Sequence, residues 1–254
     1  MNGKLCLKTV FDGKKTVADD IFFTPPFKLY SPFYENDTAK FISMSATAGV
    51  LAGDENEIIL DIGDSCNVKF TDQSYQKLFN TNGGISRQNT KITVGKNSKL
   101  IYLPHPLMTF AGCKHKAINN VEIEKNSTLC FAEIYCCGRT AMGEAFALKN
   151  FSSRTQIKID KKTDFLDNTI INPTAFPVTK KGFFEGFTHT GILYIHTPAI
   201  SAYNEVKEFI YDNYANNFAL ETACSDTADG LSVRALGNSG EDIFTLFSQL
   251  SKYI

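Results

Sequence analysis

The feature that most constrains this chain is a weak internal repeat. Four stretches share one pattern, in which a run of alternating apolar and polar residues is followed by a polar turn and a second alternating run. The four stretches are EIILDIGDSCNVKF (57–70), TKITVGKNSKLIY (90–102), VEIEKNSTLCF (121–131) and TQIKIDKKTDFL (155–166). Alternation with a period of two residues is typical of β-strands, and turns rich in Gly, Asp, Asn and Lys are typical of tight hairpins and corners.

The spacing of the repeats predicts how the strands stack. The last apolar residues before the turns are Ile62, Val94, Ile123 and Ile159, at steps of 32, 29 and 36 residues. A β unit of about 30 residues cannot bury its apolar face alone, so successive hairpins or coils are expected to stack on one another. We therefore predict a mainly β, β-helical-like single domain over residues 1–254, with the stack at 1–200.

The C-terminal part changes character. Val206, Phe209, Ile210 and Tyr214 recur at helical spacing, and 231–236 reads as a strand. Residues 222–229 are small and polar and predict a loop. Ser239 stands three residues before Asp242 and opens a second amphipathic stretch, which resembles a capping box. Residues 201–254 are thus expected to form a helix-strand-helix unit, with Phe247 in the last helix as a candidate partner contact.

Composition excludes several classes of function. Lys and Arg total 26 against 27 Asp and Glu, so the chain lacks the basic excess of a nucleic-acid-binding protein. No apolar run approaches the ~20 residues of a membrane span, and the polar N-terminus does not resemble a signal peptide. The seven cysteines include no CxxC pair, and Cys66, Cys130 and Cys136 lie in apolar runs, as buried thiols do. A cytoplasmic protein without nucleic-acid or membrane partners is expected.

Recognisable catalytic motifs are missing from the sequence. It contains no GxGxxG, GxxxxGK[ST], HExxH or GxSxG. Cys113 and His115 stand two residues apart and are able to share a face and contact a metal transiently, although a tight site needs four ligands. The alternative for this pair is a plain surface loop.

Isolated acidic residues are stronger candidates for a functional site than the Cys113–His115 pair. Glu133 interrupts an almost wholly apolar strand, where Leu129, Phe131 and Tyr135 are expected on its face. An acid at such a place must pair with a cation, meet water or bind metal. Arg139 is the nearest candidate cation. The other acids in unusual settings are Asp54, Glu144 and Asp167.

The same stretches resemble a known family. FFTPPFKLYSPFY (22–34), AGVLAGDE (48–55), TDQSYQKLFN (71–80), LPHPLMTFAG (103–112), GRTAMGEAF (138–146) and VRALG (233–237) occur in the order and spacing of the urease accessory proteins UreD, called UreH in some bacteria. The resemblance runs over essentially the whole chain. The sequence departs from the family pattern at three places. Ala48 and Ala52 stand where many relatives have Pro-Gly-Gly before the Gly-Asp motif, His105 stands where many relatives have Gln, and the Cys113–His115 pair lies outside the pattern.

The resemblance implies a function. Members are non-catalytic scaffolds that act with UreF-type and UreG-type proteins, the latter a GTPase, on apo-urease to promote insertion of nickel. The family fold is β-helical with two helices, and an internal tunnel is the proposed nickel route. No tightly bound cofactor is implied, only nickel in transit. Carried over motif by motif, the route acids are Asp54, Glu133, Glu144 and Asp167.

Two other functions remain open. Repeating strands of this period also build carbohydrate-active hydrolases, which need two carboxylates about 5–9.5 Å apart. Asp72 and Asp167 are available for such a pair but lie in different turns. The third possibility is an interaction scaffold without an ion path. A nickel route requires Asp54, Glu133, Glu144 and Asp167 to line one connected cavity, whereas an interaction scaffold does not.

Overall fold

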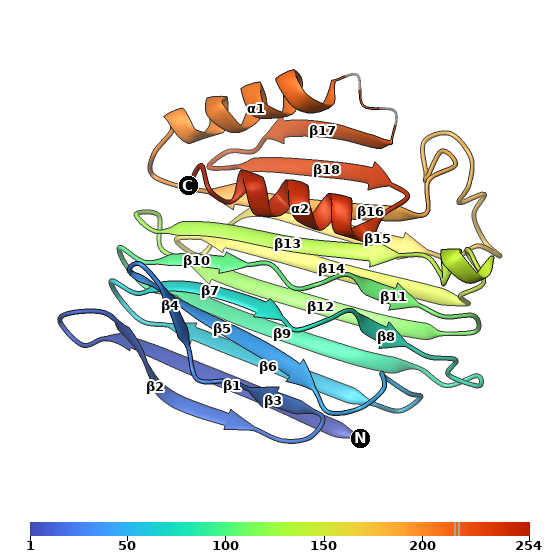
Figure 1. The fold of residues 1–254 in the computed structure, drawn as a ribbon, viewed down its shortest axis with the longest axis horizontal. Coiled ribbons are helices and arrows are strands. Elements are labelled where there is room, and N and C mark those ends of the chain that lie inside the picture. The colour runs from blue at the N-terminus through green and yellow to red at the C-terminus, as the bar shows by residue number, and fades with distance from the viewer. Residues whose placement is uncertain (216, 218) are drawn as a thin grey trace.

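The computed structural model describes every residue except 216 and 218 and consists of two facing β-sheets with two helices at one end (Figure 1). The seven-stranded sheet has the order β15-β14-β12-β9-β6-β1-β2. Its strands are β1 (Asn2–Phe11), β2 (Thr16–Phe23), β6 (Glu55–Ile62), β9 (Ser86–Val94), β12 (Lys114–Ile123), β14 (Asn150–Ile159) and β15 (Lys162–Ile171).

The eleven-stranded sheet has the path β17-β18-β16-β13-β10-β7-β5-β3, with β4, β8 and β11 paired beside it. Its strands are β3 (Phe27–Leu29), β4 (Phe33–Glu35), β5 (Thr38–Ser45), β7 (Asn67–Asp72), β8 (Gln76–Leu78), β10 (Lys99–Tyr102), β11 (Leu107–Thr109), β13 (Thr128–Cys136), β16 (His189–His196), β17 (Leu220–Asp226) and β18 (Leu231–Gly237). The helices are α1 (Ser201–Tyr214) and α2 (Gly240–Leu250), and a short 3-10 turn spans Thr140–Met142. No helix in the described part of the chain has the length and apolar character that crossing a bilayer requires.

The predicted repeat alignment is the register of the seven-stranded sheet. Ile62 lies beside Val94, Val94 beside Ile123, and Ile123 beside Ile159, all in parallel pairings. The first three repeats turn a corner from this sheet into the other one, so they are coils of a β-solenoid-like stack. The fourth repeat differs, because β14 and β15 form an antiparallel hairpin within one sheet.

The corners are tied together by side chains four residues after the aligned positions. Ser98 Oγ donates to the carbonyl of Gly63 at 2.7 Å, and Ser127 Oγ donates to that of Gly95 at 2.6 Å. Ser98 Oγ also accepts a hydrogen bond from the N–H of Cys66, and Ser127 Oγ accepts one from the N–H of Ser98. In both cases the N–H belongs to the preceding coil. Small polar residues at these positions therefore satisfy turn backbone groups that the ladders leave unpaired.

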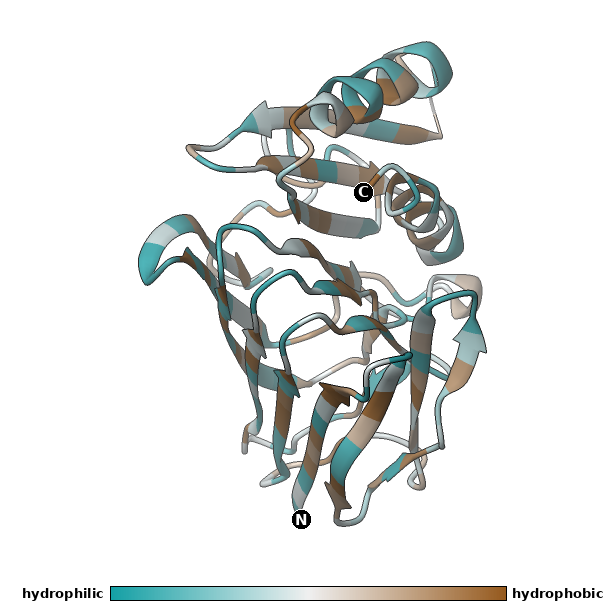
Figure 2. Cartoon of the chain, turned by 90° about the vertical axis from the view of Figure 1, so that its left-hand side faces the viewer, coloured by the Kyte–Doolittle hydropathy of each residue, from teal (hydrophilic) through white to brown (hydrophobic). Residues whose placement is uncertain are grey.

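The interior next to the corners is apolar. Neighbouring coils place Leu60, Ile92, Val121 and Ile157 in one inward-facing row, and all four are buried. Figure 2 shows the two sheets facing each other below the C-terminal strands and helices. The predicted buried thiols Cys66, Cys130 and Cys136 are confirmed, and the seven cysteines are free.

The C-terminal part contains one strand more than expected. Both helices are confirmed, and Ser239 Oγ caps α2 by accepting the N–H of Asp242 at 3.2 Å. The predicted loop at 222–229 is wrong over its first half, because Leu220–Asp226 forms β17, antiparallel to β18. Helix, two strands and helix thus follow one another, and both strands extend the eleven-stranded sheet. The polar side chains that suggested a loop belong to a largely exposed edge strand.

Phe247 is not a surface residue. It is fully buried in the apolar cluster between α1, α2 and the outer face of β13, β16 and β18. A Cβ at Gly191 of β16 would lie 2.8 Å from its ring, so the helix packs directly on the strand backbone. The expectation that Phe247 offers a partner contact is therefore wrong, because the amphipathic face of α2 is used to cover the sheet.

Candidate functional site

Away from the corners, the interior rows become polar. In the seven-stranded sheet, Thr90, Asn119, Thr155 and Asp167 are register neighbours on successive strands. In the opposite sheet, Ser43 of β5 is the register neighbour of Asp72 of β7. Glu133 of β13 and Arg234 of β18 lie on either side of the same residue of β16, Ile192. Tyr102 pairs with Phe70 on one side and with Phe131 on the other. Asp72 and Glu133 each follow one of these partners by two residues, so they lie in the same row. We call the following eight residues the polar band: Thr90, Asn119, Thr155, Asp167, Ser43, Asp72, Glu133 and Arg234.

Glu133 is the centre of the polar band. Its Oε1 accepts from Asn119 Nδ2 at 2.8 Å and from Ser153 Oγ at 2.9 Å, and its Oε2 accepts from Thr155 Oγ1. The side chain is buried, and no ion pair involving it is found within the described residues. Burial raises the pKa of Glu133, and the hydrogen bonds, led by that of Thr155, oppose the rise. The expected strand face of Leu129, Phe131, Glu133 and Tyr135 is confirmed, since all four point between the sheets.

A cavity of about 70 Å³ opens the polar band through the eleven-stranded sheet. The ladder is interrupted there at two adjacent places, after Asp72 in β7 and after Tyr102 in β10, and resumes at β8 and β11. Pro104 and Pro106 lie in the second interruption, where they have no N–H to donate to a neighbouring strand. The sequence therefore creates the opening locally. Its volume is sufficient for a few water molecules.

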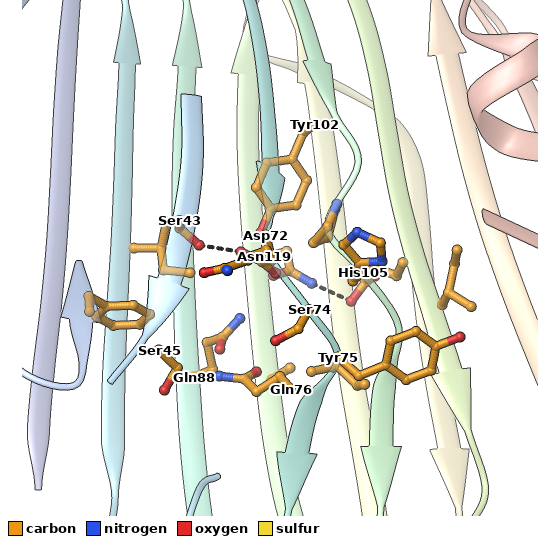
Figure 3. A pocket seen from close by; sticks show the side chains of 18 residues that line it. Ser43, Ser45, Asp72, Ser74, Tyr75, Gln76, Gln88, Tyr102, His105 and Asn119 are labelled. Atoms are coloured by element: carbon orange, nitrogen blue, oxygen red, sulfur yellow. Dashed lines mark hydrogen bonds between the residues drawn. The ribbon is translucent and has the colours of Figure 1, made fainter. Parts of the chain in front are cut away.

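The walls of the cavity carry two carboxylates and no lysine or arginine. Figure 3 shows the labelled polar residues around it, and none of its eighteen lining residues is Lys or Arg. The titratable lining residues are Asp72, Tyr75, Tyr102, His105 and Glu133. Ser43 Oγ donates to Asp72 Oδ1, and burial raises the pKa of Asp72 to about 6. Two acids without a cation make this cavity a favourable place for a positively charged guest.

His105 forms part of the cavity wall beside α2. Its ring stacks on Phe244 of α2, with centroids 4.3 Å apart and planes inclined by 9°. Its Nδ1 is buried and has no hydrogen-bond partner within the described part of the chain. Burial lowers the pKa of His105, so the imidazole is neutral at physiological pH.

Asp167 lies at the end of the polar band. Its Oδ1 is 2.5 Å from an Arg234 guanidinium nitrogen, and Thr169 Oγ1 donates to its Oδ2 at 2.8 Å. Asp167 also stands opposite Thr155, the residue that contacts Glu133. The structure therefore brings Glu133 and Asp167 into one polar layer, in which Asp167 is paired and Glu133 is not.

The other two predicted route acids lie outside this layer. Asp54 is 2.6 Å from the N-terminal amino group and accepts the N–H of Leu51 at 2.8 Å. Glu144 pairs with Arg139 at 2.5 Å and accepts the N–H of Ala111 at 3.0 Å. Arg139 therefore meets Glu144 and not Glu133, and neither Asp54 nor Glu144 lines the cavity.

Cys113 and His115 are both buried, unlike residues of a surface loop. Burial raises the pKa of the Cys113 thiol to about 12 and lowers that of His115 to about 4, which favours the thiol and the neutral imidazole. Ser86 Oγ lies 2.9 Å from His115 Nδ1. Within the described residues, no three His, Cys, Asp or Glu side chains converge in a way that holds a metal ion.

Asp72 was not among the acids predicted for the route. It ends the second strand of the first repeat, two residues after Phe70, just as Glu133 stands two residues after Phe131. Aligning the second strands of the repeats, in addition to the first, gives the signal that places both acids in one row.

Comparison with known proteins decides the family. The sequence model described as UreD urease accessory protein matches residues 1–254. The chain belongs to the UreD family. It is 31% identical to the urease accessory protein UreH of Helicobacter acinonychis, over all of this chain and 95% of that protein. It is 31% identical to UreH of Helicobacter pylori strain G27, over 98% of this chain and 93% of that one. It is 32% identical to the urease accessory protein UreD of Acetivibrio thermocellus, over 91% and 88% of the two chains.

Proposed function

We propose that this UreD-family protein is a cytoplasmic, non-catalytic assembly factor that acts with UreF-type and UreG-type proteins on apo-urease. In this proposal the UreG-type partner hydrolyses GTP, because the chain itself has no phosphate-binding loop motif. Nickel is the cargo of the complex and is not a resident cofactor of this chain. The family assignment over the whole chain supports the proposal.

We further propose that nickel passes through the cavity in the polar band. The observation that carries this step is the pair of carboxylates, Asp72 and Glu133, on a wall that has no lysine or arginine. Oxygen ligands bind a divalent ion, and a site with few protein ligands lets it leave again. Asp167 stands next to this path, but an ion reaches its carboxylate only in competition with Arg234. Asp54 and Glu144 would join a route only after their own ion pairs opened.

The experiment compares two isosteric variants in a reconstituted accessory complex with apo-urease. Glu133→Gln removes one of the two carboxylates that line the cavity, and Glu144→Gln removes a paired carboxylate outside it. We expect Glu133→Gln to fold and assemble but to lose most nickel-dependent urease activation, and Glu144→Gln to retain it. Full activation by Glu133→Gln would exclude Glu133 from the route.

We propose that the partner surface lies in the C-terminal third, as expected from the sequence, but at α1 and the residue before it. Because Phe247 is buried, the candidates for a UreF-type contact are Ile200 and Tyr211, each 75% exposed. Tyr211→Ser should leave the fold intact and weaken binding to the UreF-type protein. Unchanged affinity of Tyr211→Ser and of Ile200→Ser would place the contact elsewhere.

A further inference from the structure

The cavity wall contains a buried nitrogen atom that makes no hydrogen bond within the described residues. His105 Nδ1 is buried and lacks a partner within the described residues, although leaving a buried polar atom unpaired is unfavourable. The residue lines the same cavity as Asp72 and Glu133. A guest in the cavity that accepts a nitrogen lone pair would satisfy it.

The His105 ring is held in a defined orientation. Phe244 of α2 stacks on one face, and the Tyr75 ring lies 6.1 Å away, centroid to centroid. Pro104 and Pro106 restrict the backbone on both sides. A ring fixed in this way presents its nitrogen without first losing much side-chain entropy, as a ligand residue should.

We propose that His105 is a ligand for borderline transition ions in this cavity and makes it prefer Ni²⁺ to Mg²⁺ and Ca²⁺. The inference rests on the proposed passage of nickel and specifies how the cavity selects its cargo. Carboxylates alone suit Mg²⁺ and Ca²⁺ well, whereas an imidazole nitrogen favours Ni²⁺. No three His, Cys, Asp or Glu side chains of the described residues converge on one point, so we expect an ion here to be held by few protein ligands and to leave readily.

The test measures binding of NiCl₂ and of MgCl₂ to the metal-free full-length chain by calorimetry. His105→Phe removes the nitrogen and keeps an aromatic ring against Phe244, and His105→Gln keeps a polar side chain without the imidazole. We expect both variants to lose affinity for Ni²⁺ by about tenfold, equivalent to about 1.4 kcal/mol, with Mg²⁺ binding unchanged. Asp72→Asn should weaken the binding of both ions.

Two results would overturn the inference: Ni²⁺ affinity within twofold of wild type in both His105 variants, or equal losses for Ni²⁺ and Mg²⁺. Melting temperatures of the two variants identify any general loss of structure, which His105→Phe is designed to avoid. The metal preference is read on the isolated chain, and urease activation by Glu133→Gln is read in the complex. A failure of the His105 inference is therefore distinguishable from a failure of the proposed route.

Discussion

Thr155 of the seven-stranded sheet donates a hydrogen bond across the interior to Glu133 of the eleven-stranded sheet. Asn119 and Ser153 reach the same carboxylate from the same side. An acid that seemed to need a cation is thus held by three neutral donors, which favour its charged form without neutralising it. Burial raises the pKa of Glu133, and the three donors oppose that rise, so they reduce the cost of a negative charge at this place.

The first prediction concerns this contact. Thr155→Val removes one donor from a buried carboxylate and should lower the free energy of unfolding by about 1–3 kcal/mol. In a Glu133→Gln background the same change should cost less, because the amide is neutral and needs the donor less. Chemical denaturation of the single and double variants measures the coupling. Equal costs in the two backgrounds would show that Thr155 stabilises the fold independently of Glu133.

Much of this arrangement follows from the sequence. The period of the repeat predicts the parallel register of Ile62, Val94, Ile123 and Ile159, because each coil must bury its apolar face on the next. Alternation along β13 predicts the inward direction of Glu133. Both are local patterns that the stack simply repeats.

The partners of the acids did not follow from the sequence. Asn119 and Thr155 reach Glu133 from the opposite sheet, and Arg234 reaches Asp167 from a strand 67 residues away. These contacts depend on how the two sheets face each other, which no periodicity encodes. β17 was missed for a related reason, since an edge strand pairs on one side only and needs little apolar surface.

The second prediction is a pH dependence caused by Asp72. Its pKa rises from 3.8 to about 6 on folding, so between these values the folded state binds more protons than the unfolded state. Its contribution to stability is complete below pH 4, falls as pH rises to about 6, and is constant above that. Asp72→Asn should therefore be more stable than wild type at pH 8, by at most about 3 kcal/mol, and similar at pH 4. Denaturation in the presence of a chelator measures the difference, and a difference that does not change with pH would contradict the assignment.

The third prediction concerns the ion pair that ends the polar band. Arg234→Met should lower the free energy of unfolding by about 1 kcal/mol, because Asp167 is only 8% exposed but the arginine is 56% exposed and partly screened by water. The control is Arg87→Met, which breaks a pair with Glu55 in which both side chains are largely exposed, at 45% and 57%. The control should change stability by less than about 0.5 kcal/mol. Equal effects would mean that Asp167 is no more dependent on its partner than a surface acid.

The fourth prediction concerns the packing of α2 on β16. A methyl group at Gly191 would lie 2.6 Å from Ile243 Cγ2 and 2.8 Å from the Phe247 ring. Gly191→Ala should therefore push α2 off the sheet and cost about 1–3 kcal/mol, the usual range for overpacking a core. Phe247→Ala should cost about 3–5 kcal/mol by leaving a cavity at the same place.

The double variant separates packing from other causes. If the methyl group and the ring compete for the same space, Gly191→Ala should cost much less once Phe247 is Ala, so the two losses are not additive. Thermal or chemical unfolding of the four proteins gives the coupling energy. Additive losses would mean that the Phe247 ring does not limit the space at Gly191, which would leave Ile243 as the contact that a methyl group meets.

Deleting 239–254 should prevent stable folding, because α2 covers the outer face of β13, β16 and β18. Point variants on α1 are therefore the way to map the partner surface.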